Sequence, residues 1–339
     1  MTKRSDILTD FIAQSGWSDA DSKVIAGDAS NRRYLRLTRP NGASAILMDA
    51  PPDKGEDVRP FIHIAEVLTD QGLSAPQIMH RDIELGLLII EDLGDDLFAR
   101  ILKTSPELEN SLYSAATDVL VSLHDTAPPS GLEPYSIPMM ADMAALACDW
   151  YADGLDASDP VGRQRLKDAM TGALALLDGL EDVLIQRDYH AENLLWLPER
   201  SGKARVGLLD FQDAMRGHRA YDLVSLLQDA RRDVSPQVES DMIKHYVTAW
   251  GGNPAAFNTA YHVLGAQRNL RIIGVFARLC LRDGKAHYVD FIPRVWDYLM
   301  RDLHHAALGP LLTVVQDVLP HPSESALQRL RAKCATQLT

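Results

Sequence analysis

Residues 186–214 read QRDYHAENLLWLPERSGKARVGLLDFQDA, and the rest of the chain can be interpreted around this stretch. Two short, largely apolar runs, 194–197 and 205–209, flank a polar segment with proline, serine and glycine, so the sequence predicts a tight β-hairpin. Because a hairpin brings its outer ends together, Asn193 and Asp210 should be neighbours. Asp188 should lie one turn away from them.

These three polar side chains suit magnesium-dependent phosphoryl transfer. Mg²⁺ is held by oxygen ligands, commonly one or two carboxylates together with substrate phosphates. In kinases, the aspartate that accepts the proton of the attacking hydroxyl lies five residues before a metal-binding asparagine. Asp188 and Asn193 have this spacing, and Asp210 stands where the second metal ligand is expected. We therefore predict Asp188 as the catalytic base, and Asn193 and Asp210 as Mg²⁺ ligands.

The run from Asp188 to Asn193, with Asp210-Phe211 after the hairpin, resembles the aminoglycoside phosphotransferase and choline kinase group of small-molecule kinases. Further segments are similar to the bacterial kinases that phosphorylate the anomeric hydroxyl of N-acetylmuramate and N-acetylglucosamine during cell-wall recycling. These segments are 210–214, 221–227, 267–270 and 276–279. The resemblance extends over most of the chain and implies ATP as the phosphoryl donor, Mg²⁺ as the metal and a sugar as the acceptor.

The length of 339 residues favours two lobes that share a cleft. We expect an α+β, protein-kinase-like fold, with a small nucleotide-binding lobe over residues 1–93 and a helical catalytic and substrate lobe over residues 94–339. Strands are predicted at 23–26, 34–38, 44–48 and 85–90, and helices at 5–16, 61–71, 106–124, 139–151, 162–180, 221–231 and 266–282.

Composition limits the partners and the compartment. The formal net charge of −13 argues against nucleic acid as a partner, because phosphate backbones are bound by basic surfaces. No apolar run is long enough for a membrane span, and the first residues lack an apolar signal core, so we expect no membrane contact and a cytoplasmic protein. The three cysteines, Cys148, Cys280 and Cys334, are expected to be reduced. We expect a monomer or a weak homodimer that binds ATP and a small-molecule sugar.

Nucleotide contacts are expected at two places. The turn 27–33 occupies the position of a kinase nucleotide loop, and 91–94 resembles the hinge whose backbone binds adenine. The residues predicted to contact the nucleotide are Ser30, Asn31, Arg32, Arg33, Glu91 and Leu93. A glycine at the end of a strand most often only makes a turn, so Gly27 alone is weak support for the loop.

The third strand departs from the family. Kinases usually place a lysine there to bind the α- and β-phosphates, whereas this chain has Met48. Arg33 or Lys54 could replace the lysine, or metal ions could neutralise more of the charge. Arg36 and Arg39, further along the second strand, are expected on a solvated face.

Loop-support and acceptor contacts are expected from the helical lobe. In the family that this sequence resembles, an acid such as Asp222 braces the catalytic loop, and we expect Gln186 and His190 to support that loop as well. The family generally has histidine at the position of Gln186. Asp229 lies seven residues after Asp222 on the same helix face, where it could meet a sugar hydroxyl.

A basic stripe follows on the helix predicted at 266–282. Arg268, Arg271, Arg278 and Arg282 fall within an arc of roughly 80°. Such a stripe must face solvent, acidic groups or an anionic ligand. If the acceptor is N-acetylmuramate, Arg271 or Arg268 is a candidate partner for its lactyl carboxylate.

Alternative functions remain open at this point. The acceptor could be an aminoglycoside, choline or another small alcohol, although a polycationic aminoglycoside would need an acidic pocket rather than an arginine stripe. The chain could also be a nucleotide-binding pseudokinase scaffold, since it lacks the usual lysine and has Gln186. A metal-dependent hydrolase is less well supported, because no histidine cluster accompanies the acids.

Overall fold

The chain divides into two units of packing in a computed structural model, which describes residues 3–25 and 31–337. Unit 1 comprises Met1–Leu108 and Ala191–Ala214, and unit 2 comprises Glu109–His190 and Met215–Thr339. The chain passes from one unit to the other within the stretch 186–214, so that Asp188 belongs to unit 2 and both Asn193 and Asp210 belong to unit 1. The predicted lobes, 1–93 and 94–339, stay a prediction.

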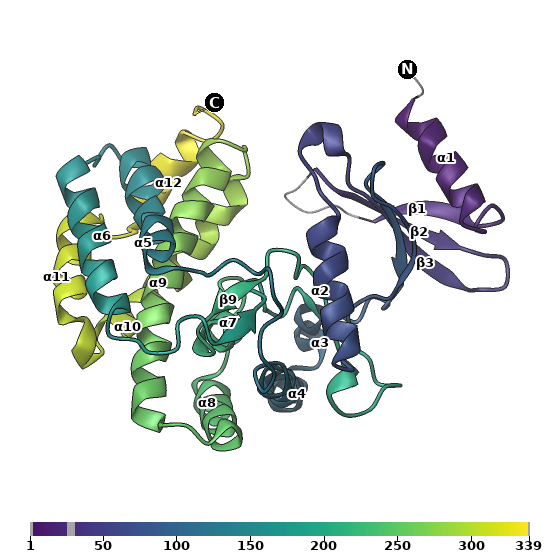
Figure 1. The fold of residues 1–339 in the computed structure, drawn as a ribbon. Coiled ribbons are helices and arrows are strands. Elements are labelled where there is room, and N and C mark those ends of the chain that lie inside the picture. Colours follow the sequence, from purple (N-terminus) through teal and green to yellow (C-terminus); the bar gives the residue numbers. More distant parts are fainter. Residues whose placement is uncertain (1–2, 26–30, 338–339) are drawn as a thin grey trace. The chain divides into compact units, whose positions relative to one another are not determined.

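Unit 1 is built on an antiparallel sheet with α1 (Arg4–Gln14) on one face and α2 (Arg59–Asp70) on the other (Figure 1). The strand order is β1 (Asp21–Ile25), β2 (Arg33–Thr38), β3 (Ser44–Asp49), β5 (Leu87–Glu91) and β4 (Ile78–Asp82). Side chains alternate between the faces of a strand. Leu37, Leu47 and Ile89 therefore pack with Phe11 of α1 in one apolar cluster.

The predicted hairpin is confirmed. Strand β7 (Leu194–Trp196) pairs with β8 (Val206–Leu208), and Leu194 lies opposite Leu208. Ser74, which precedes β4, fastens the hairpin to the rest of unit 1: its carbonyl accepts the Leu208 N–H at 2.9 Å, and its hydroxyl donates to the Ala204 carbonyl at 2.6 Å. Helix α3 (Phe98–Thr104) adds a bond from the Ala99 N–H to the Ala191 carbonyl at 2.9 Å.

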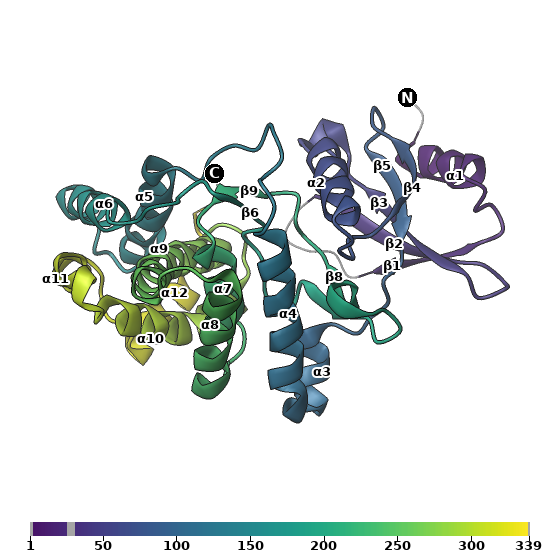
Figure 2. The same ribbon diagram turned by 60° about the horizontal axis from the view of Figure 1, so that its bottom comes forward.

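Unit 2 surrounds helix α9 (Pro254–Leu281), which packs against α5 (Ile137–Leu146), α7 (Ala220–Leu227) and α10 (Ile292–Leu303) (Figures 1 and 2). The other helices are α4 (Glu109–Leu123), α6 (Pro160–Leu174), α8 (Pro236–Trp250), α11 (Gly309–Val318) and α12 (Glu324–Ala332). Helix α9 begins at Pro254 rather than at residue 266, because the Asn253 side chain caps it by accepting the N–H groups of Ala255 and Ala256.

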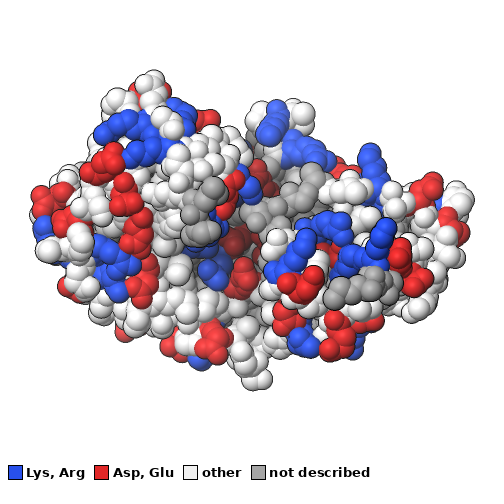
Figure 3. Space-filling model, turned by 90° about the horizontal axis from the view of Figure 1, so that it is seen from above, with Lys and Arg blue, Asp and Glu red and all other residues white. Residues whose placement is uncertain are grey.

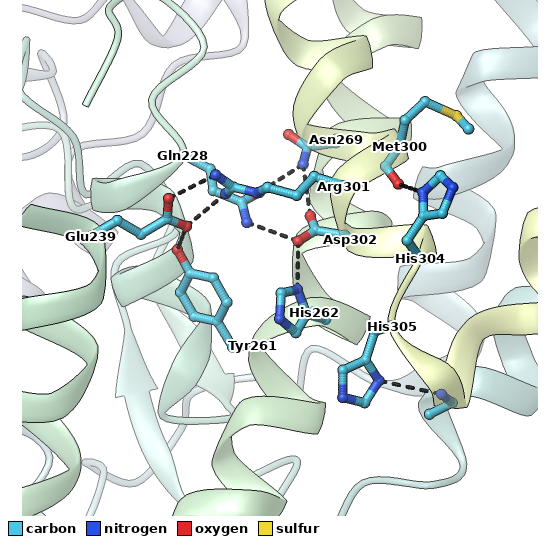
Figure 4. Close-up of polar contacts among 11 residues, drawn as sticks. Gln228, Glu239, Tyr261, His262, Asn269, Met300, Arg301, Asp302, His304 and His305 are labelled. Carbon is cyan, nitrogen blue, oxygen red and sulfur yellow. Dashed lines mark hydrogen bonds and ion pairs between the residues drawn. The ribbon is translucent and has the colours of Figure 1, made fainter. Parts of the chain in front are cut away.

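A buried polar network ties three helical segments of unit 2 together. The Asp302 carboxylate accepts hydrogen bonds from the side chains of Gln228 at 3.0 Å, Asn269 at 3.2 Å and His262 at 2.9 Å (Figure 4). Asn269 also donates to the Gln228 side-chain oxygen at 2.8 Å. Because buried polar groups must be hydrogen-bonded, this network fixes the end of α7 against the middle of α9.

The surface carries charges of both signs side by side over each unit, as the drawn face shows (Figure 3). Many of these charges form ion pairs, such as Arg163 with Asp149 and Arg331 with Asp290, each 2.5 Å apart. Among the described residues, no helix combines the length and the apolar character that crossing a membrane requires.

His218, just before α7, makes the fold sensitive to acid. Its Nδ1 accepts the Ala220 N–H at 3.1 Å, and burial and the charge of Arg219 lower its pKa to about 4. The ring is therefore neutral in the folded state but takes up a proton in the unfolded chain below about pH 6.5. Its contribution to stability is present above pH 6.5 and is lost as the pH falls towards 4.

We expect His218→Asn to flatten this dependence, because asparagine can accept the same N–H but does not titrate. Between pH 6.5 and 4 the unfolding free energy of the wild type should fall more steeply than that of the variant, by up to about 1.4 kcal/mol per pH unit. Urea unfolding at pH 7.5, 6 and 5 measures the difference. Equal slopes for the two proteins would show that His218 is not the titrating group.

Candidate functional site

Asn193 and Asp210 meet at the open end of the β7–β8 hairpin, as the sequence predicts. The Asn193 Nδ2 donates to Asp210 Oδ2 at 3.4 Å, and the backbone extends the ladder with a bond from the Leu209 N–H to the Asn193 carbonyl at 3.0 Å. Gln212 Nε2 donates to the other oxygen, Asp210 Oδ1, at 2.8 Å. Both Asn193 and Asp210 are partly exposed, so a ligand can approach them.

This pair fits a hard divalent cation in its chemistry. A carboxylate and an amide oxygen are the ligand types that Mg²⁺ takes from proteins, with water or phosphate completing its shell. Rotation of the Asn193 side-chain amide by half a turn exchanges its nitrogen and its oxygen, which have nearly the same size. The oxygen then lies beside Asp210 and can act as a metal ligand. Among the described residues there is no cluster of three or more histidine, cysteine or acidic side chains suited to a metal.

The backbone at Asp210 adopts a left-handed conformation, which the described part of the chain also shows at Asp156, Arg187 and Ala335 among non-glycine residues. Asp210 has a φ of 57°, in the left-handed region that costs non-glycine residues energy. The next residue, Phe211, is fully buried and stacks on Phe61 of α2, with 5.0 Å between the ring centroids. The packing of Phe211 stabilises the turn that presents the Asp210 carboxylate.

Unit 2 holds Asp188 in a loop that follows strand β6 (Val183–Ile185), which pairs with β9 (Met215–Gly217). The fully buried Asp222 accepts the N–H groups of Gln186 at 2.6 Å and Arg187 at 2.9 Å. Arg187 has a φ of 73°, so it too lies in the left-handed region immediately before Asp188. This is the geometry that a loop-supporting role for Asp222 requires.

Gln186 contacts Asp222 through its backbone, whereas its side-chain Nε2 is buried and has no hydrogen-bond partner among residues 3–25 and 31–337. On the other side of the loop, the Tyr189 hydroxyl donates to the Ala116 carbonyl of α4 at 2.8 Å. Burial raises the pKa of Asp222 to about 7, although the two N–H bonds act in the opposite direction.

The electrostatic environment keeps Asp188 ionised. Burial alone would raise the pKa of Asp188, but the positive charges of Arg271 and Arg268 outweigh it, so the pKa lies below its ordinary value. An ionised carboxylate can accept a proton from a hydroxyl group. The arrangement is therefore chemically competent for general-base catalysis at neutral pH.

His190 and Asp229 lie within electrostatic reach of each other and of Asp188. Burial, first of all, lowers the pKa of His190 to about 4, against the opposing charges of Asp229 and Asp188. Its Nε2 contacts Arg231 Nη1 at 3.4 Å. Asp229 is 1% exposed, and its Oδ1 accepts the Arg231 N–H at 2.8 Å.

The residues expected near the nucleotide phosphates form contacts within unit 1. Ser30 lies outside the described residues. The Asn31 N–H and the Arg32 Nε donate to the two carboxylate oxygens of Glu56, at 3.0 and 2.8 Å. Their phosphate contacts stay a prediction.

Arg33 pairs with Asp49 at the end of β3. Asp49 is fully buried and also accepts from Arg4 of α1, with 2.6 Å between Arg4 Nη2 and Asp49 Oδ1. Met48, at the place of the usual lysine, is buried within the sheet. By strand alternation Arg33 and Asp49 lie on the α1 face of the sheet, opposite to Met48.

Arg36 has partners that the sequence did not indicate. Its side chain is partly exposed, in line with a solvated face, and it also binds the expected hinge: its Nε contacts Asp92 Oδ2 at 2.7 Å, and its Nη1 contacts Asp95 Oδ2 at 2.7 Å. These charge-assisted bonds join β2 to the segment after β5. The Arg36 contacts therefore hold residues 92–95 close to strand β2.

The two hinge residues named from the sequence differ in exposure. Leu93 is 9% exposed, whereas the side chain of Glu91 is 23% exposed and accepts from Arg200 of the β7–β8 connection. The Glu91 N–H donates to the Gln77 carbonyl at 2.8 Å.

Two supporting residues were missed from the sequence. Ser225 lies one turn after Asp222 on α7; its hydroxyl donates to the Arg187 carbonyl at 3.4 Å and accepts from Arg268 Nη2 at 2.7 Å. A polar residue within the otherwise apolar helix AYDLVSLL was the available signal. Asp49 is the second: an acid that ends a buried strand needs a partner.

Sequence comparisons identify relatives over most of the chain. The model of the phosphotransferase enzyme family matches residues 21–257. The chain is 39% identical over 326 residues to an N-acetylmuramate/N-acetylglucosamine kinase of Caulobacter vibrioides, covering 85% of this chain and 89% of the relative. It is 32% identical to a protein of the same name from Pseudomonas aeruginosa, covering 90% and 92% of the two chains.

Solved structures share the fold at low sequence identity. The choline kinase LicA from Streptococcus pneumoniae superimposes with a TM-score of 0.60 at 16% identity, covering 88% of this chain and 99% of that chain. The ADP-bound aminoglycoside phosphotransferase APH(2'')-Ib gives a TM-score of 0.60 at 11% identity, covering 88% and 98%. These similarities confirm the predicted α+β, kinase-like fold.

Proposed function

Because this chain belongs to the phosphotransferase enzyme family, we propose that it transfers the γ-phosphoryl group of ATP to the anomeric hydroxyl of N-acetylmuramate or N-acetylglucosamine. The observation that carries the acceptor is the 39% identity to a kinase named for these two sugars, over most of both chains. The chemistry is supported by the residues themselves, since Asp188, Asn193 and Asp210 are all present with the kinase spacing.

Asp188 is the proposed base. It accepts the proton of the acceptor hydroxyl as that oxygen attacks the γ-phosphorus, and Arg271 and Arg268 keep its carboxylate ionised beforehand. Asp222 orients the loop through the N–H groups of Gln186 and Arg187. General-base catalysis of this kind contributes about 10²- to 10⁴-fold to the rate.

Asn193 and Asp210 are the proposed Mg²⁺ ligands. When bound, the ion would neutralise charge that develops on the β- and γ-phosphate oxygens. The contribution of the chain is to hold an amide and a carboxylate side by side at the hairpin end, with Gln212 and Phe211 fixing Asp210.

For the nucleotide, we propose contacts from Ser30, Asn31 and Arg32 to the phosphates. Arg33, also expected there, pairs with Asp49 on the sheet face opposite to Met48, so it does not take the place of the usual lysine. Backbone groups of Glu91 and Leu93 are proposed to face the adenine. The bonds from Arg36 to Asp92 and Asp95 support the hinge part of this proposal, because they fix the backbone next to these two residues.

For the acceptor, Asp229, Arg268 and Arg271 are the proposed contacts. Asp229 Oδ2 is buried and has no hydrogen-bond partner in the described part of the chain, so it can accept from a sugar hydroxyl. Each unsatisfied buried group costs about 1–3 kcal/mol. A bound sugar would remove that cost at Asp229.

A panel of acceptors tests the proposal. We expect ATP-dependent phosphorylation of N-acetylmuramate and N-acetylglucosamine that stops when EDTA removes Mg²⁺, and little turnover of kanamycin or choline. ADP release measures the rate, and NMR coupling between phosphorus and the anomeric carbon identifies the linkage. Turnover of kanamycin or choline with neither amino sugar active would contradict the proposed acceptor, and no turnover of any acceptor despite ATP binding would favour a scaffold.

A further inference from the structure

Three arginines of helix α9 share one side of the helix and are here called the arginine stripe: Arg268, Arg271 and Arg278. At about 100° per residue they fall within an arc of roughly 80°. Arg268 is 3% exposed, whereas Arg271 and Arg278 are partly exposed. Burying a guanidinium is costly unless its charge and its N–H groups find partners.

The hydrogen-bonding groups of the stripe are not all satisfied. Arg268 Nη2 donates to Ser225 Oγ, but Arg268 Nε and Nη1 and Arg278 Nε are buried and have no partner within residues 3–25 and 31–337. The neighbouring Asp229 offers one unused acceptor, Oδ2. The unused donors of the stripe favour a ligand that brings oxygen acceptors.

The stripe also creates a positive potential. Arg271 and Arg268 lower the pKa of Asp188 even though burial acts in the opposite direction. Arg231 and Arg187 add further positive charge around His190 and Asp188. A ligand that brings a negative charge to this side of α9 is therefore favoured over a neutral one of the same shape.

We propose that Arg271, with Arg268 beside it in the stripe, binds a carboxylate on the acceptor and so sets the preference between acidic and neutral amino sugars. This inference rests on the proposed function. N-acetylmuramate and N-acetylglucosamine share the ring, the acetamido group and the anomeric hydroxyl, but only the first carries a lactyl carboxylate. Guanidinium groups bind carboxylates in a planar, charge-assisted geometry.

The two arginines have different parts in this site. Arg268 is buried and is linked through Ser225 to the Arg187 carbonyl, next to Asp188, so it positions the loop. Arg271 lies one helical turn further and remains partly exposed, so a ligand can reach it. Arg271 is therefore the residue whose replacement should affect specificity rather than folding.

The competing explanation is that the stripe only keeps Asp188 ionised or meets the phosphates of the nucleotide. Either role would matter equally for both sugars, because the base and the nucleotide are common to the two reactions. The carboxylate role, by contrast, matters only for N-acetylmuramate. The ratio of kcat/KM for the two sugars therefore separates the explanations.

The experiment measures kcat/KM for both sugars with wild type, Arg271→Gln, Arg271→Lys and the control Arg282→Gln. For Arg271→Gln we expect kcat/KM to fall with both sugars, because Arg271 also keeps Asp188 ionised, but to fall about tenfold further with N-acetylmuramate than with N-acetylglucosamine. Arg271→Lys should fall in between, because an ammonium keeps the charge but not the planar pair of donors. Arg282 already pairs with its neighbour Asp283 at 2.6 Å, so its replacement should leave kcat/KM unchanged for both sugars.

The methyl ester of N-acetylmuramate provides a second probe, since it keeps the bulk of the lactyl group without its charge. With wild type, the ester should be less active than the acid by about the factor by which Arg271→Gln lowers kcat/KM for N-acetylmuramate relative to N-acetylglucosamine. In Arg271→Gln the acid and the ester should be about equally active. An equal fall for both sugars, or an unchanged ratio, would overturn the proposal. Failure of the proposed function is a separate result, because wild type itself would then phosphorylate neither sugar.

Discussion

Asp188→Asn should lower turnover by about 10²- to 10⁴-fold while the protein still folds and binds ATP. Asparagine has nearly the same shape as aspartate, so the loop held by Asp222 can keep its path. The neutral amide cannot take the proton of the acceptor hydroxyl. The loss should therefore appear in kcat, with the KM for ATP little changed.

The variant must be distinguished from a damaged protein. Asp188 balances the charges of Arg271 and Arg268, so the melting temperature should be recorded for each variant. Asp168→Asn is the matched control: it makes the same chemical change at an exposed position of α6, where the carboxylate accepts from Gln164 at 2.8 Å. A folded, ATP-binding Asp188→Asn protein with near-wild-type turnover would refute the assignment of the base.

The hairpin and its polar ends could be predicted because the relevant interactions are local. Asn193 and Asp210 are 17 positions apart in the chain and become neighbours through one turn. Spacing and turn chemistry are sufficient for inferences of this kind. The contact of Asp222 with the loop is not local, since its partners Gln186 and Arg187 lie 36 and 35 positions away, and it was expected from the family resemblance instead.

Strands β4, β6 and β9 and helices α3, α8, α10, α11 and α12 were not predicted, and for the strands the reason is different. Strands β6 and β9 are three residues each, too short for alternation to be visible, and their pairing joins distant segments. Strand β4 lies at the edge of the sheet, and its middle residues His80 and Arg81 are exposed, so its sequence does not show the alternation of a half-buried strand. Tertiary pairing determines such elements more than local propensity does.

The roles of the arginines could not be read from strand parity alone. Arg33 and Arg36 lie on opposite faces of β2, and the sequence does not show which face has acidic partners. Asp49 lies on one side, and Asp92 and Asp95 lie on the other. Each pairing depends on a residue at least 16 positions away in the chain, so it follows from sheet register rather than from the local sequence.

Gly274→Ala should destabilise the protein by about 3 kcal/mol, near the upper end of what overpacking a core by one methyl group costs. Gly274 lies in the part of α9 that crosses α5. A Cβ atom there would lie 2.3 Å from the Leu146 carbonyl carbon and 2.4 Å from its oxygen. Because these are backbone atoms, no side-chain rotation relieves the clash, and the two helices must move apart.

Gly172→Ala supplies the matched control. Gly172 is also inside a helix, α6, but a Cβ atom there has no other atom within 4 Å among those of the described residues. The same substitution should stabilise the protein by about 0.5–1 kcal/mol, because alanine loses less backbone entropy than glycine on forming a helix. Urea unfolding midpoints for the two variants should therefore shift in opposite directions, and a shift of both in the same direction would contradict the close packing of α5 and α9.

The position of Gly274 also bears on the acceptor site. Arg271 lies three residues before Gly274 on α9, so a displacement of α9 from α5 moves the arginine as well. The folded fraction of the Gly274→Ala protein should therefore have a higher KM for the sugar than the wild-type protein has. Its KM for ATP should be unchanged. The close packing of α5 against α9 would then determine where the partly exposed guanidinium of Arg271 meets its ligand.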